Sequence, residues 1–168
     1  MLQMRQGLAD HRASGAALGQ PDFLAHLAEA QGKENQGEPD WVLLDEAFAL
    51  IEKNDERWYE AEVYRLKGEL LLAQEIKRQK SENPNPHSQI LDPQSEAGAC
   101  FLKAIEVAQK QQAKSWELRA TVSLARLWQR QGKTAEAHRM LSAIYGWFTE
   151  GFDTKDLQEA KVLLEALS

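Results

Sequence analysis

Large and small apolar residues recur along this chain with the spacing of a two-helix repeat of about 34 residues. In the first third of the chain, Leu24, Leu27 and Ala28 are followed by Leu44 and Ala47. The corresponding residues of the last third are Leu124, Ala125, Trp128, Gly132, Ala137, Leu141 and Ile144. Alternation of polar and apolar residues with period two is not sustained, so strands are not expected. The pattern therefore predicts an all-α fold.

The middle repeat is interrupted by extra residues. Tyr64, Gly68 and Leu71 fit its first helix, and Phe101 fits its second, with about 17 residues more than the usual spacing between them. Residues 77–94 contain three of the five prolines of the chain and few large apolar residues. We expect this stretch to be a mobile, solvated insertion.

The periodicity predicts a single domain over residues 1–168, a right-handed α-α superhelix of about three helix pairs like that of tetratricopeptide proteins. Its expected parts are a leading helix at 1–20, a first repeat at 21–54, a second repeat at 56–112 that includes the insertion 77–94, a third repeat at 115–150 and a capping helix at 154–168. The capping helix is expected because its apolar residues fall on one face and its charged residues on the other.

Capping residues predict where individual helices begin. Pro21 is expected in the first turn of a helix, where its missing N–H leaves no bond unmade. Ser95, Ser115 and Thr134 are the expected N-caps of three later helices. The expected helices between the leading and capping helices start near residue 21 and then run over about 40–53, 56–78, 95–112, 115–131 and 134–149.

Composition and charge exclude several classes of function. The formal net charge of −6 argues against a general nucleic-acid binder, which needs a basic face to neutralise phosphates. No apolar run approaches the ~20 residues of a membrane span, and the N-terminus lacks the apolar core of a signal peptide. Cys100 is the only cysteine, so no internal disulfide forms, and we expect it to be a small buried hydrophobe. These features predict a cytoplasmic protein that binds neither nucleic acid nor membrane.

No motif in the chain supplies a reaction. Gly132-Lys133-Thr134 resembles the end of a phosphate-binding P-loop, but Leu127 stands where that motif needs a glycine, and the surrounding pattern is helical. The histidines have no i, i+4 pair and no cysteine cluster beside them; they are His11, His26, His87 and His138. A Gly-x-Ser-x-Gly nucleophile turn is absent. We therefore expect no enzyme activity, catalytic residue, cofactor or metal.

The first helix of each repeat is expected to line a concave groove that binds a protein partner. The candidate partner-binding residues are Arg65, Glu69, Arg119, Val122, Arg126, Gln129 and Arg130. In the first repeat the same rule selects Asp22, Ala25 and Glu29. We expect the groove to be electrically asymmetric, because residues 113–140 hold six Lys or Arg against two acids, whereas residues 1–64 hold five against thirteen.

The basic end of such a groove suits an acidic peptide, since arginine presents a fork that carboxylates accept bidentately. The alternative interpretation is that these charges only keep a helix surface soluble.

Five tryptophans offer a second kind of candidate surface. Trp128, Trp147-Phe148 and Tyr145 are expected in the core because they occupy packing positions or adjoin the last turn. Trp41, Trp58 and Trp116 lie near expected helix starts, where one edge of the ring stays wet. Aromatic residues of this kind are enriched among interface anchors.

Three stretches resemble a known family: residues 58–71, residues 113–128 and residues 144–161, which include the segment WFTEGFDT. They are similar to the C-terminal tetratricopeptide-like region of large bacterial signalling ATPases. In that family the region follows a nucleotide-binding module and often a class III adenylate/guanylate cyclase domain. The chain holds neither of those modules, so the resemblance implies a context and transfers no catalytic residue.

Two functions remain open at this point. The first is a regulatory, protein-binding scaffold, expected to be a detached, fragment-like arm of a bacterial signal-transduction ATPase or cyclase. The alternative is a structural self-association segment, which would form a homo-oligomer and have no separate ligand.

Overall fold

The structure is a computed structural model that describes residues 2–15, 18–34, 40–80 and 92–168. These residues form helices and connecting turns without any strand, so the all-α prediction is confirmed for them. The helices are α1 (Leu2–Ala13), α2 (Gln20–Glu34), α3 (Trp41–Asn54), the 3-10 helix η1 (Arg57–Tyr59), α4 (Glu60–Lys80), α5 (Pro93–Lys110), α6 (Lys114–Arg130), α7 (Thr134–Tyr145) and α8 (Lys155–Ala166).

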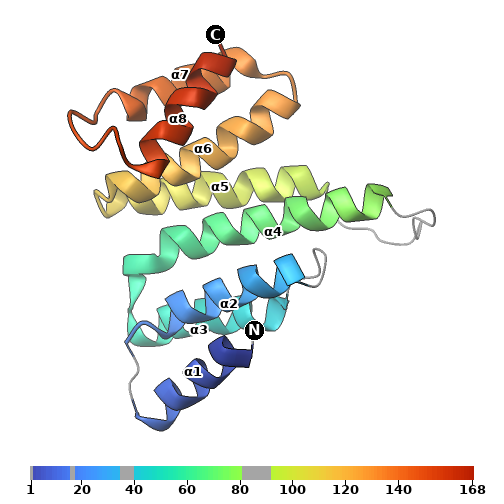
Figure 1. Cartoon of the computed structure of the whole chain (residues 1–168), viewed down its shortest axis with the longest axis vertical. Coiled ribbons are helices and arrows are strands. Elements are labelled where there is room, and N and C mark those ends of the chain that lie inside the picture. The colour runs from blue at the N-terminus through green and yellow to red at the C-terminus, as the bar shows by residue number, and fades with distance from the viewer. Residues whose placement is uncertain (1, 16–17, 35–39, 81–91) are drawn as a thin grey trace.

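The helices stack in sequence order, each packed against the next (Figure 1). Consecutive helices run back and forth across the stack, with α1 at one end and α7 and α8 at the other. In addition, α2 contacts α4, α4 contacts α6, and α6 contacts α8. These four helices therefore form a row of their own along the stack.

Three large apolar clusters hold the stack together between successive sets of helices, and a small fourth one lies between α4 and α5. The first includes Leu24, Ile51 and Leu66 from α2, α3 and α4. The second centres on the fully buried Phe101 between α4, α5 and α6. The third includes Leu141 and joins α6, α7 and α8. The alanines of the repeat pattern have no exposed surface, which lets neighbouring helices approach closely; they are Ala28, Ala47, Ala97, Ala104, Ala125, Ala137 and Ala160.

The expected end of the leading helix differs in the structure. The leading helix, expected over 1–20, ends at Ala13. Gly15, just after the end of α1, has a φ angle of 76°, a conformation that ends a helix and that glycine adopts without strain. Pro21 lies in the first turn of α2, as predicted.

The expected insertion 77–94 is shorter than its composition indicates. Helix α4 continues to Lys80, and α5 begins at Pro93. Asp92 caps α5, because its side chain accepts a hydrogen bond from the backbone N–H of Gln94 at 3.2 Å, so the prediction of Ser95 as the cap was wrong. The predicted mobility concerns residues 81–91, which lie outside the described residues.

The expected caps of α6 and α7 were also wrong. Ser115 and Thr134 lie inside the first turn of their helices, and the preceding N-cap positions make no side-chain cap bond. Helix α7 ends at Tyr145, four residues before the predicted end, because the chain turns tightly there. In that turn the backbone N–H of Phe148 donates to the carbonyl of Tyr145 at 3.2 Å.

The described residues do not meet the requirements of a membrane-spanning helix or of a metal site. Among them, no helix is both long enough and apolar enough to cross a bilayer. Over the same residues, no three His, Cys, Asp or Glu side chains are grouped as a metal site would require.

Candidate interaction groove

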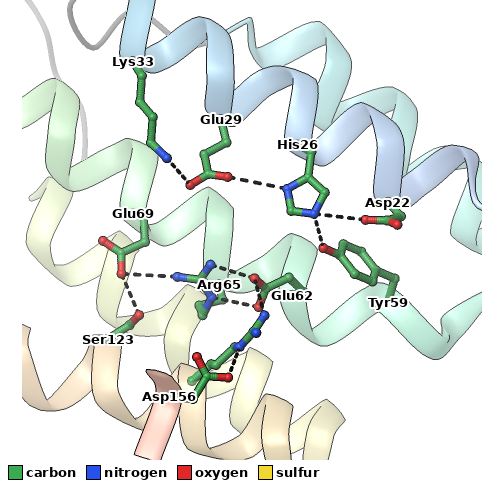
Figure 2. Close-up of polar contacts among 11 residues, drawn as sticks. Asp22, His26, Glu29, Lys33, Tyr59, Glu62, Arg65, Glu69, Ser123 and Asp156 are labelled. Atoms are coloured by element: carbon green, nitrogen blue, oxygen red, sulfur yellow. Dashed lines mark hydrogen bonds and ion pairs between the residues drawn. The ribbon is translucent and has the colours of Figure 1, made fainter. Parts of the chain in front are cut away.

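A groove of about 330 Å³ follows the row formed by α2, α4, α6 and α8. Its walls are mostly charged and come from all four helices. The lining residues are His26, Glu29, Glu62, Arg65, Arg119, Val122, Ser123, Arg126, Lys155, Asp156 and Glu159. In Figure 2, several of these side chains reach toward one another from different helices.

Four of the seven candidate residues line this groove: Arg65, Arg119, Val122 and Arg126. Glu69 lies beside it and accepts a hydrogen bond from Ser123 at 2.6 Å (Figure 2).

The remaining two candidates lie elsewhere. Arg130 lines a separate hollow of about 200 Å³ that also includes Ile76 and Leu127. Gln129 lines neither hollow. In the first repeat Glu29 lines the groove as expected, but Ala25 is buried and the next residue, His26, faces the groove in its place.

The pair formed by Glu62 and Arg65 is the most buried ion pair of the groove. Arg65 donates from Nε to Glu62 Oε2 at 2.8 Å and from Nη2 to Oε1 at 2.7 Å (Figure 2). The side chain of Glu62 is 3% exposed and that of Arg65 is 18% exposed. A carboxylate this buried needs its arginine, so this pair serves to hold the wall of the groove.

Arg119 and Arg126 of α6 are paired with acids of α8. Arg119 Nε donates to Asp156 Oδ2 at 2.6 Å, and Arg126 Nη2 donates to Glu159 Oε2 at 2.8 Å. The hydrogen bond from Arg126 lowers the pKa of Glu159. The predicted basic end of the groove therefore also holds carboxylates, which a helix later in the sequence supplies.

Charge in the groove is consequently balanced rather than asymmetric. Its lining contains the cations Arg65, Arg119, Arg126 and Lys155 and the anions Glu29, Glu62, Asp156 and Glu159. The excess of Lys and Arg lies in residues 113–140, whereas the acids that balance it lie beyond residue 140, on α8. The signal available in the sequence was the i, i+3 spacing of Asp156 and Glu159 on one helical face.

His26 organises the α2 end of the groove. Its Nε2 lies 2.7 Å from the hydroxyl of Tyr59 and 3.3 Å from Asp22 Oδ1, and its Nδ1 lies 3.5 Å from Glu29 Oε2 (Figure 2). The hydrogen bond with Glu29 raises the pKa of His26, and the nearby carboxylates of Asp22 and Glu62 add to this effect.

The same hydrogen bond, with help from Lys33, lowers the pKa of Glu29 to about 2. The carboxylates around His26 thus favour its imidazolium form.

The tryptophans divide differently from the prediction. Trp41, Trp116 and Trp128 are half-buried and pack against the core clusters. Trp58 is 49% exposed. Trp147, expected in the core, is 58% exposed, because the early end of α7 carries it outward into the turn before α8.

Trp58 and Trp147 belong to one edge of the stack. The turns before α2, α4, α6 and α8 all lie on that side of the molecule (Figure 1). Gln111 donates to the carbonyl of Arg57 at 2.6 Å, and the ammonium of Lys114 lies 5.8 Å from the ring centre of Trp147. We call the exposed large apolar residues of these turns the aromatic edge; they are Leu18, Trp58, Trp147 and Phe152.

Comparison with known proteins adds no family. No protein-family model matches the chain, and no curated protein matches it. The resemblance to the tetratricopeptide-like arm of signalling ATPases therefore stays a hypothesis.

Proposed function

We propose that this chain is a protein-interaction module, built as a right-handed tetratricopeptide-like superhelix, whose groove binds an acidic segment of a partner protein. The observation that supports this most is that four helices separated in sequence contribute side chains to one groove. A stack in which every second helix faces the same side offers an extended surface of this kind. The partner-facing residues would be Arg119 and Arg126, with Arg65 holding the wall behind them.

The proposed setting is the cytoplasm, with the chain acting as a regulatory arm of a bacterial signalling ATPase or cyclase. This setting rests on the resemblance of residues 58–71, 113–128 and 144–161 to that family. We propose no catalysis by the chain and no cofactor.

The test uses capture from a lysate of the source cells. Immobilised wild-type protein is compared with the variant Arg119→Gln, Arg126→Gln and with a control, Lys103→Gln, Lys110→Gln. The control removes the same charge from exposed positions of α5 that pair with Glu106. We expect a specific protein on the wild type and the control and its loss from the groove variant. Equal capture by all three proteins would place binding outside the groove.

Glutamine is used because reversal to Glu would set like charges against α8. A Glu at position 119 would face Asp156 and lie near Glu62, whose carboxylate is 3.7 Å from the present guanidinium. Loss of capture would then be confused with loss of structure.

A second candidate function is self-association, and the aromatic edge favours it. Exposed tryptophans are enriched at the centres of protein interfaces. Sedimentation velocity tests this alternative: a dimer that the change Trp58→Ser, Trp147→Ser converts to a monomer would support it, and a wild-type monomer at high concentration would exclude it.

A further inference from the structure

The acids that face the groove arginines come from the last helix of the chain. Asp156 and Glu159 lie three residues apart on α8, on the side turned toward α6. There they pair with Arg119 and Arg126, which are seven residues apart on α6. The last helix thus presents to the groove the same chemistry that an acidic partner would bring.

These two pairs differ from the pair of Glu62 and Arg65 in their access to solvent. All four side chains of the α6–α8 pairs are about one-third or more exposed, whereas Glu62 is almost fully buried against Arg65. Exposed ion pairs contribute little to stability, so exchanging one carboxylate for another at Arg119 or Arg126 is energetically easy. Exchange at Arg65 would leave the buried carboxylate of Glu62 with only the more distant Arg119, at 3.7 Å.

Such an exchange leaves α8 in place. Leu157, Ala160 and Leu163 of α8 are buried in the third apolar cluster and fix the helix against α6 and α7. The carboxylates of Asp156 and Glu159 can therefore turn away by side-chain rotation while the helix stays docked.

We propose that Asp156 and Glu159 are a built-in competitor for the groove, and that a partner binds by displacing both from Arg119 and Arg126. This inference rests on the proposed function. The partner that fits is an acidic helical segment with two carboxylates three residues apart, because that spacing on α8 already reaches both arginines. A segment with one carboxylate displaces only one of the two acids, and a neutral segment displaces neither.

The probe is a fluorescein-labelled, alanine-rich helical peptide that carries one Asp and one Glu three residues apart. A second peptide has Asn and Gln at those positions. Binding is measured by fluorescence anisotropy at low ionic strength, with circular dichroism and melting temperature recorded for every protein. The key protein variant is Asp156→Asn, Glu159→Gln, which removes the competitor.

We expect the competitor-free variant to bind the acidic probe about tenfold more tightly than the wild type, because two exposed ion pairs no longer have to be broken. The matched control is Glu136→Gln, Glu165→Gln. It changes the net charge equally at exposed positions away from the groove and should bind like the wild type. Adding Arg119→Gln, Arg126→Gln to the competitor-free variant should abolish binding, and the neutral probe should bind none of the proteins.

Three results would overturn the proposal. The first is equal binding by the wild type and the competitor-free variant, which leaves the proposed function standing if the arginine changes still abolish binding. The second is an equal gain in the matched control, which assigns the effect to net charge. The third is no binding of the probe to any of the proteins, and the capture experiment then decides the proposed function independently.

Discussion

The ring of Phe101 lies directly over Gly68, so close that a β-carbon added at Gly68 would stand 2.5 Å from Phe101 Cε1. Phe101 is fully buried between α4 and α5 and has no room to withdraw. Only a glycine permits this approach, although glycine is a poor residue for the interior of a helix. The contact between these two residues sets the spacing of α4 and α5.

We expect Gly68→Ala to lower the free energy of unfolding by about 1–3 kcal/mol, because overpacking outweighs the gain in helix propensity. The matched control is Gly98→Ala on α5, where the new β-carbon would meet Leu127 Cδ2 at an ordinary 3.6 Å. This control should be neutral or stabilise by up to about 1 kcal/mol. Urea unfolding measures both changes, and equal effects of the two would contradict the argument.

Removing Arg65 should destabilise the protein far more than removing an exposed groove arginine. Arg65→Met leaves the carboxylate of Glu62 buried with only Arg119 nearby, and we expect a loss of about 3 kcal/mol. Arg126→Gln breaks a partly exposed pair and should cost less than about 1 kcal/mol. The double change Glu62→Met, Arg65→Met should recover most of the loss. Failure to recover would mean that Arg65 stabilises the fold through other contacts.

The stability contributed by His26 should fall as the pH rises. Its folded-state pKa is raised above the ordinary value of 6.5, chiefly by the hydrogen bond with Glu29. The charged form is therefore favoured by folding, and its contribution is complete below pH 6.5 and lost as the pH rises through the raised pKa. The difference in unfolding free energy between the wild type and His26→Gln should be constant below pH 6.5 and shrink as the pH rises above 6.5.

A titration of His26 followed by nuclear magnetic resonance checks the cause. Glu29→Gln should bring the pKa of His26 down, while Asp22 and Glu62 still face the ring. An unchanged midpoint would assign the shift to those acids instead. The pKa of Glu29 is lowered to about 2, so its contribution to stability depends on pH in the opposite direction. That contribution is present above pH 4.5 and disappears as the pH falls toward 2.

Cys100 should react slowly with a thiol reagent in the native protein. The side chain is buried in the second apolar cluster, and this burial raises the pKa of the thiol. Both effects reduce access to the reactive thiolate. We expect the rate with an aromatic disulfide reagent to be at least about tenfold slower in native buffer than in denaturant. A native rate equal to the denatured one would show that α5 opens readily.

The helices were predictable from sequence because each must bury one apolar face, and that requirement leaves a period in the chain. Phe101, Ala104 and Leu124 entered the core where the pattern placed them. Helix ends were less predictable, because several neighbouring residues can each serve as the N-cap. Asp92, and not Ser95, is the N-cap of α5, because Pro93 follows it and has a φ angle fixed near the helical value.

The candidate groove was predictable only in part, for a different reason. The repeat positions identify residues such as Arg119 and Arg126 that face the row of helices. They do not identify what faces those residues from another helix. Asp156 and Glu159 lie 37 and 33 residues further along the chain, and only packing of α8 on α6 brings them near. Charge along the sequence is therefore a poor guide to charge in a groove.

The stacking of each helix on its neighbours has a consequence for how the chain folds. The helix pairs in substantial contact are separated by no more than one intervening α-helix, so most native contacts join residues close in sequence. Loops that close between such residues are short, and proteins with this property reach the native state quickly, often in milliseconds or less. The pair of Arg126 and Glu159 closes a loop of 33 residues, far longer than the seven residues that separate Arg119 and Arg126 within α6. The cationic face of α6 is thus expected to form before the carboxylates of α8 arrive to cover it.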